Sequence, residues 1–221
     1  QERPILSYTS DTLDTVAGPY GQNTSYFTLQ RFKIQNNHRN GFRTSATHNF
    51  MNVIDIWLYN NSYSDGTTMF GDANLYFLGS SNNWIFHSTS QKSFGHGFKI
   101  GDGASNNTLE WSVAKEAGYW YDSFPYSYYF GSSATAIDFP NDNADSGGDG
   151  YIDRGWNNII RYNIVDTSLY YGVQLRRTPN FSFHHNEIID ACKFDAVDMS
   201  IKGVGRKDLA ILYEDTYGSV Y

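Results

Sequence analysis

The chain has 221 residues, of which 40% are hydrophobic, and 16 Lys and Arg against 23 Asp and Glu give it a formal net charge of −7. The apolar content is enough for a packed core, which excludes global disorder, and the length predicts one domain over residues 1–221. The negative charge, without a basic cluster, argues against a nucleic-acid partner, and no run of about 18 apolar residues predicts a membrane-spanning helix.

The residue types favour β structure, and the first residue suggests a processed chain. There are 18 Tyr, 15 Phe and one Cys, Cys192, which excludes an intrachain disulfide. Good helix formers are scarce, whereas aromatic residues favour strands. The chain begins at Gln1 rather than Met, which is typical of a processed secretory protein or of a trimmed chain. We therefore expect a secreted, extracellular protein.

A repeat runs along the chain. Each copy has a short apolar strand, a polar corner, a small residue and a second strand, and the copies are 32–43, 56–68, 84–99, 112–120, 163–174 and 186–198. The small residues, Gly41, Gly66, Gly97, Gly118, Gly172 and Ala196, are separated by steps of 25, 31, 21, 54 and 24 residues. Five Asn-Asn pairs supply residues that suit corners. The repeat predicts an all-β parallel β-helix of six or seven rungs, with a sandwich or jelly roll as the alternative.

The repeat is interrupted at about 123–156, which predicts a loop insertion. This stretch contains Asp145, Asp149 and Asp153, in the sequence DSGGDGYID. These nine residues match the start of an oxygen-rich calcium loop, although the twelfth position is Trp156 rather than Glu. We expect calcium at these three carboxylates, or else an acidic, glycine-rich turn.

Stacked rungs place equivalent residues in columns. The residue after the small residue is expected to point inward, as Phe42, Phe98, Tyr119 and Val173. The residue after that is expected to point outward, as Arg43, Thr68, Lys99, Trp120 and Gln174. The residue before the small residue is also expected to point outward, as Asn40, Asp65, His96 and Tyr171. Arg43 and Lys99 then share a column two rungs apart, or ~10 Å.

This column suits an acidic polysaccharide. β-Elimination on a uronate needs a base for the proton beside the carboxylate, and a cation for the negative charge that develops. Lys99 is the candidate base and Arg43 the candidate carboxylate partner. The candidate sugar-binding residues are Asn40, His96, Trp120, Tyr171, Gln174 and Arg176. The alternative is a solvated pair of basic side chains.

One segment resembles a known family. The stretch GHGFKIGDG, residues 95–103, is similar to the GFK-containing segment of family-nine pectate lyases. The resemblance implies a right-handed parallel β-helix, Lys99 as the catalytic base and a calcium site made by Asp residues on the two preceding rungs. By position those Asp residues correspond to Asn40, Ser64, Asp65 and Thr68, so only Asp65 remains acidic.

These observations predict a polysaccharide lyase with calcium as a candidate cofactor. A non-catalytic carbohydrate-binding protein and a structural or adhesive β-helix that associates end to end are the alternatives. The pair His184-His185 is not expected to bind metal, because adjacent strand residues point to opposite faces.

Overall fold

The structure is a computed structural model that describes residues 4–7, 25–37, 40–44, 49–61, 73–93, 96–101, 103–117, 137–139, 156–168, 172–176, 180–189, 211–214 and 218–220. Every regular element in these ranges is a β-strand, and all strand pairs are parallel. The all-β prediction is therefore confirmed, as is parallel pairing between 32–43 and 56–68, where β3 lies beside β6.

The strands form three sheets, named A, B and C. Sheet A contains β1 (Ile5–Ser7), β3 (Lys33–Gln35), β6 (Trp57–Tyr59), β9 (Thr89–Gln91), β12 (Val113–Ala117), β15 (Ile164–Ser168) and β18 (Glu187–Ile189). Sheet B contains β2 (Thr28–Gln30), β5 (Asn52–Ile54), β8 (Trp84–Phe86), β11 (Thr108–Glu110), β14 (Ile159–Arg161), β17 (Phe181–His184) and β20 (Gly218–Val220). Sheet C contains β4 (Phe42–Thr44), β7 (Ala73–Leu78), β10 (His96–Gly101), β13 (Ile137–Phe139), β16 (Val173–Arg176) and β19 (Ile211–Glu214).

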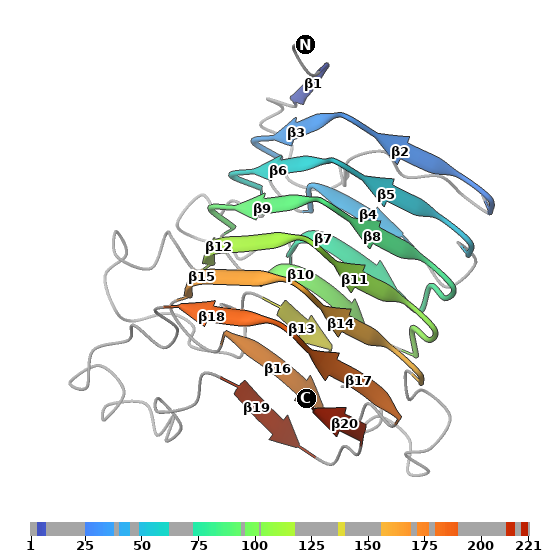
Figure 1. Ribbon diagram of the computed structural model, residues 1–221. Helices are drawn as coiled ribbons and strands as arrows, with labels where there is room; N and C mark the ends of the chain where they lie inside the picture. The colour runs from blue at the N-terminus through green and yellow to red at the C-terminus, as the bar shows by residue number, and fades with distance from the viewer. Residues whose placement is uncertain are drawn as a thin grey trace, which may run out of the picture.

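The chain visits the sheets in a fixed order. From β2 to β19 it runs through sheets B, A and C in turn, and each such set of three strands, here called a rung, pairs with the next set (Figure 1). The described strands make six rungs, within the predicted six or seven. Residues about one rung apart in sequence therefore lie side by side.

The corners between strands depend on single residues in the left-handed backbone region. Each non-glycine residue with positive φ in the described ranges falls at one of three corners. Tyr26, Phe50, Asn82, Asn106, Asn157 and Asn180 lead into sheet B; Arg31, Asp55, His87, Trp111, Tyr162 and His185 join sheet B to sheet A; Asn36, Asn60, Lys92, Glu116 and Thr167 end the extended part of sheet A. Since this conformation is unfavourable for residues with a Cβ atom, its recurrence indicates a corner geometry set by the whole stack.

The Asn-Asn pairs serve these corners, as the sequence predicted. In each pair the first Asn has a positive φ and the second is buried. Asn107, for example, is fully buried and accepts hydrogen bonds at Oδ1 from the backbone N and side-chain Nδ2 of Asn83, at 3.0 Å each. Its own Nδ2 donates to Ser80 O at 3.0 Å and to Asn158 Oδ1 at 3.3 Å. The buried Asn side chains thus link one rung to the next.

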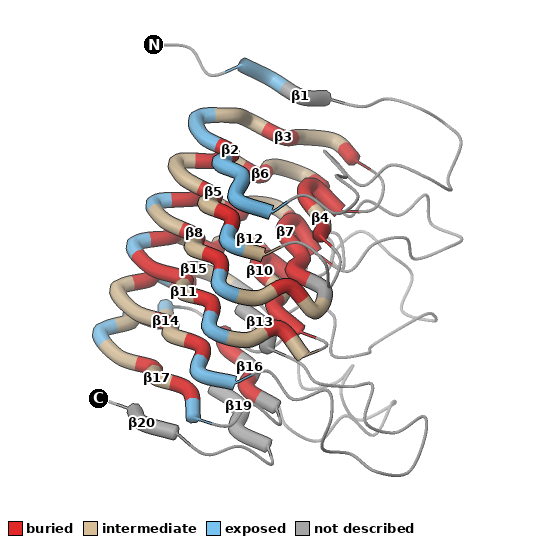
Figure 2. The backbone as a smooth tube through the Cα atoms, turned by 90° about the vertical axis from the view of Figure 1, so that its right-hand side faces the viewer, coloured by how far each residue is buried: buried red, intermediate tan, exposed pale blue. Residues whose placement is uncertain are grey.

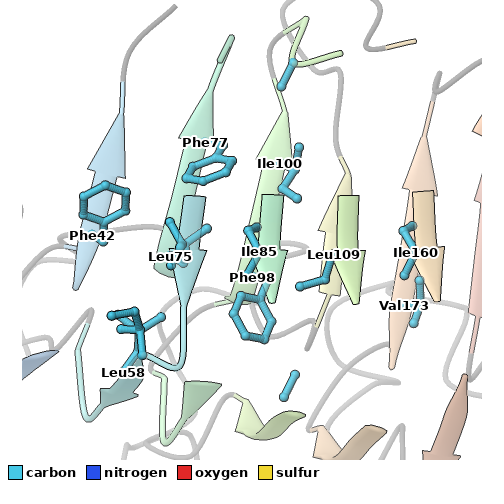
Figure 3. Packing of buried hydrophobic residues seen from close by; sticks show 14 of the residues in the cluster. Phe42, Leu58, Leu75, Phe77, Ile85, Phe98, Ile100, Leu109, Ile160 and Val173 are labelled. Atoms are coloured by element: carbon cyan, nitrogen blue, oxygen red, sulfur yellow. The ribbon is translucent and has the colours of Figure 1, made fainter. Parts of the chain in front are cut away.

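The apolar core lies between the three sheets. In most three-residue strands only the middle residue is buried, and exposed residues gather at the corners (Figure 2). Phe42, Leu75 and Phe98 lie on successive strands of sheet C and point into the core (Figure 3). Val173 is also fully buried, so the inward direction predicted for Phe42, Phe98 and Val173 is confirmed; Tyr119 lies outside the described residues.

The predicted spacing is wrong in three rungs. The strand of sheet C in the second rung is β7, so the position equivalent to Gly41 is Asn74 rather than Gly66. In the fourth rung that strand is β13, which lies inside the stretch 123–156 that was predicted to be an insertion. In the sixth rung it is β19, which lies beyond the predicted copy at 186–198 and its small residue Ala196. The predicted period is wrong there because the connections before β7, β13 and β19 are longer than those before β4, β10 and β16, and small residues elsewhere in the sequence matched the repeat by chance.

Replacing Asn107 with Leu should destabilise the fold by about 3 kcal/mol or more, because several buried backbone and amide groups lose their partners. Urea denaturation measures this change in the free energy of unfolding. Asn52→Ala is the control: Asn52 is partly exposed and donates one long hydrogen bond, at 3.4 Å to Thr28, so its cost should stay within about 0.5 kcal/mol. Equal stability of the two variants would contradict the proposed role of the buried Asn side chains.

Candidate active site on sheet C

Three side chains line up across sheet C. The register pairs Arg43 of β4 with Tyr76 of β7, and Tyr76 with Lys99 of β10. Arg43 and Lys99 therefore share a column two rungs apart, as the sequence predicted. Alternation explains their direction, because each lies between two buried, inward-pointing neighbours, such as Phe98 and Ile100 around Lys99.

Tyr76 separates the two cations. The guanidinium carbon of Arg43 lies 5.3 Å from the centre of the Tyr76 ring, and Nζ of Lys99 lies 4.8 Å from the same point. Both distances are within the range of a cation–π interaction. Tyr76 is only 4% exposed, whereas both cations are partly exposed. The ring thus spaces two positive groups along one face of the sheet.

Glycines flank the column. Gly97 and Gly101 share the outer face of β10 with Lys99, so Lys99 supplies the one side chain that this strand places there. Beside Arg43, a Cβ atom on Gly41 would lie 2.6 Å from Asn61 Nδ2 and 2.6 Å from the carbonyl O of Asn74. Only glycine fits such an approach, which explains its place directly before β4.

Two of the predicted sugar-binding residues are not on this face. Asn40 and His96 are buried, with 1% and 3% of their surfaces exposed, so their predicted outward direction is wrong. Each lies two residues before an inward-pointing Phe, and residues two apart on a strand point to the same side. The Oδ1 of Asn40 accepts a hydrogen bond from the backbone N of Ala73, which gives Asn40 a structural role.

The remaining predicted residues are placed only in part. Gln174 and Arg176 belong to β16, and Gln174 continues the column through Asp138 of β13, the register partner of Lys99. Trp120, Tyr171, Asp65, Asp145, Asp149 and Asp153 lie outside the described residues. Their predicted roles stay predictions.

Sequence reasoning missed Tyr76. The second rung was aligned on Gly66, which placed Thr68 in the column. The alternation in Ala73–Leu78 carried the needed signal, because apolar Leu75 and Phe77 flank a single Tyr. Buried strands with that pattern turn the middle residue outward.

Calcium does not fit the described part of the site. The ligand expected at the first position is Asn40, a neutral amide already committed to Ala73 N. In the described ranges no group of three or more His, Cys, Asp or Glu side chains could hold a metal ion.

No helix of this part of the chain has the length and apolarity to cross a membrane.

A second cluster of polar and aromatic side chains lies on sheet B and its corner. Arg161 Nε and Glu110 Oε2 are 2.5 Å apart, and Glu110 Oε1 accepts a hydrogen bond from Trp84 Nε1 at 2.7 Å. The Trp111 and Tyr162 rings stack with centres 4.6 Å apart. No feature of the sequence pointed to this cluster, since its members come from three separate strands and two corners.

The histidines beside this cluster contradict the opposite-face prediction. His184 Nδ1 and His185 Nδ1 lie 2.8 Å apart, so the two adjacent side chains are on the same side. His185 has φ of 54°, and this corner conformation ends the alternation of β17. The pKa of His184 is lowered by desolvation, and further by the nearby positive charges of His185 and Arg161.

Comparisons with known proteins find one distant likeness. Neither the protein families nor the curated proteins include a match to the chain. Among solved structures, the chain is similar to the crystal structure of an alginate lyase from Paenibacillus sp. str. FPU-7, with 9% sequence identity and a TM-score of 0.49. The likeness covers 72% of this chain and 55% of that one, so the chain spans about half the length of that protein. A likeness this weak assigns no activity, and the site is interpreted from its own geometry.

An NMR titration should find the pKa of His184 below the ordinary histidine value. His184 should therefore take up its proton at a lower pH than an ordinary histidine does. His185→Asn removes one of the charges that lower this pKa, so the midpoint should rise. His87→Asn, at the same kind of corner three rungs earlier, should leave it unchanged. A midpoint unaffected by His185→Asn would contradict the coupling.

Proposed function

We propose that the chain is a right-handed parallel β-helix whose sheet C carries the active site of a lyase for an anionic, uronate-containing polysaccharide. The observation that supports this most is the alignment of Arg43 and Lys99 on either side of Tyr76. Right-handed winding follows the strong preference of connections between parallel strands. The substrate class implies a secreted protein that acts outside the cell.

The reaction assigned to this column is β-elimination. The neutral amine of Lys99 takes the proton from the carbon that bears the uronate carboxylate. The electrons of that C–H bond form a carbon–carbon double bond, and the glycosidic C–O bond on the next carbon breaks. The leaving oxygen gains a proton, so one product ends in a hydroxyl group and the other in an unsaturated uronate.

Arg43 is proposed to hold the substrate carboxylate. Negative charge moves onto this group as the proton leaves, and a guanidinium that binds both carboxylate oxygens stabilises it. Two strand spacings separate Arg43 from Lys99, about 9.6 Å at ~4.8 Å each, so one sugar residue is long enough to reach from one cation to the other.

Tyr76 is proposed as a positioning residue. Its ring contacts both cations and lies in the strand between theirs. A ring there keeps the two charged groups apart and limits the directions that each can take. The mechanism uses no metal step.

Substitutions at Lys99 test the reaction on a panel of polyuronates, with the absorbance of unsaturated products as the readout. Lys99→Ala should lower kcat by about 10²–10⁴-fold, as expected for a lost general base. Lys99→Arg should be equally impaired, because a guanidinium stays protonated. Lys115→Ala is the control, since Lys115 is also partly exposed but belongs to sheet A. Cleavage by Lys99→Ala at the parent rate would refute the assignment of the base.

Substitutions at Tyr76 and Arg43 separate positioning from chemistry. Tyr76→Phe keeps a ring between the cations, so it should retain most of the activity, whereas Tyr76→Ala should lose about tenfold or more. Arg43→Ala should raise KM and lower kcat together, because carboxylate binding and charge stabilisation are both lost. If Tyr76→Phe lost as much activity as Tyr76→Ala, the main role would belong to the phenol hydroxyl rather than to the ring.

Glycan binding without cleavage is the second candidate. Its support lies on sheet A, where Lys33 Nζ is 4.3 Å from the Trp57 ring centre and 5.0 Å from that of Tyr59. Lys92 Nζ lies 5.8 Å from the Tyr59 ring centre as well. Mixed aromatic and cationic surfaces suit acidic sugars. Retention on an acidic glycan column without product formation would favour this function over the lyase.

Calcium binding by Asp145, Asp149 and Asp153 remains part of the proposal as a separate, structural site. A ligand that binds only the folded state stabilises it by about 2.7 kcal/mol at a hundredfold excess over Kd. Calcium should therefore raise the melting temperature, EDTA should reverse the change, and Asp149→Asn should abolish it. The same melting temperature with calcium and with EDTA would exclude the site.

A further inference from the structure

The adjacent histidines at the end of β17 are joined by a hydrogen bond between their Nδ1 atoms. His184 is the last residue of the strand and His185 is the corner residue that follows, with φ of 54°. On a continuous strand their rings would lie on opposite faces. The corner instead brings the two Nδ1 atoms to 2.8 Å from each other, on a partly exposed surface.

We propose that His184 and His185 form a two-nitrogen chelating site for a late transition-metal ion, with Cu²⁺ bound most strongly. In a metal–imidazole site each nitrogen lies about 2.0–2.1 Å from the ion, so two nitrogens at a right angle are about 2.9 Å apart. In the structure the two nitrogens are joined by a hydrogen bond at 2.8 Å, which is close to this value, so the ion would take the place of the shared proton. Right angles between ligands are typical of square-planar and tetragonal Cu²⁺ and Ni²⁺ sites.

The neighbouring side chains hold the two rings in place. The centre of the Tyr162 ring lies 5.8 Å from that of His184 and 5.0 Å from that of His185. Tyr162 is itself stacked on Trp111, so the rings belong to a packed column of corner residues. Such packing restricts the two imidazole rings before binding, so less conformational entropy is lost when both bind one metal ion.

One charged side chain near the site would oppose a bound metal ion. Arg161 is this nearby cation, and it is paired with the carboxylate of Glu110. Glu110 offsets part of this charge, but the charge of Arg161 still lowers the pKa of His184, so it opposes a bound cation as it opposes the proton. Copper is the preferred ion because it has the highest affinity for nitrogen donors among the divalent metals of its row.

Calorimetric titration of the full chain with CuCl₂ tests the proposal. We expect a 1:1 site in the parent that weakens about tenfold or more in His184→Gln and in His185→Asn, because a chelate loses its second donor. Asn is chosen at 185 because it tolerates positive φ. His87→Asn, a corner histidine that lies beside Asp55 rather than a second histidine, is the control and should bind as the parent does.

Electron paramagnetic resonance of the parent chain with one equivalent of Cu²⁺ gives a readout that needs no variant. The spectrum should contain hyperfine coupling from two imidazole nitrogens. Unchanged copper affinity in both His184→Gln and His185→Asn, or a parent spectrum without nitrogen coupling, would overturn the proposal. An equal loss in His87→Asn would overturn it too.

Discussion

The register between rungs is the constraint on which the rest of the structure depends. Most strands are three residues long, and in β3, β6 and β8 only the middle side chain is buried. A slip of one residue would expose that side chain and bury its two neighbours. The corners prevent such a slip, because the residues with positive φ occur at equivalent positions in successive rungs. The buried Asn side chains add hydrogen bonds that only one register satisfies.

The two candidate sites follow from this constraint in different ways. On sheet C, parallel register stacks outward residues in columns, and it brings Arg43, Tyr76 and Lys99 together from strands far apart in sequence. At the corner after β17, a single positive φ breaks alternation and brings His184 next to His185. The strands therefore bring together functional side chains from different rungs, whereas a corner brings together two side chains of the same rung.

The sequence predicted the architecture better than the details of the site. Alternation and the Asn-Asn pairs were enough for parallel rungs, for the inward direction of Phe42 and Phe98 and for the shared column of Arg43 and Lys99. Tyr76 was missed because the number of residues in a rung depends on the length of its connections. The short strands do not reveal that length, so the second rung was aligned at the wrong residue. Asn40 and His96 were predicted to be on the wrong face. Each is two residues before an inward-pointing Phe, with a glycine between, and the prediction did not apply strand alternation to the residue before that glycine.

The distance between residues 43 and 99 tests the central claim, that register holds the two cations on one face of sheet C. Nitroxide labels on Arg43→Cys and Lys99→Cys, in a chain whose Cys192 is replaced by Ser, allow this distance to be measured by electron paramagnetic resonance. Labels two strand spacings apart, about 10 Å, should broaden the spectrum strongly. A matched pair at 43 and 115, on different sheets, should broaden it less. Labels at 43 and 99 that show no dipolar broadening would contradict the register and, with it, the candidate active site.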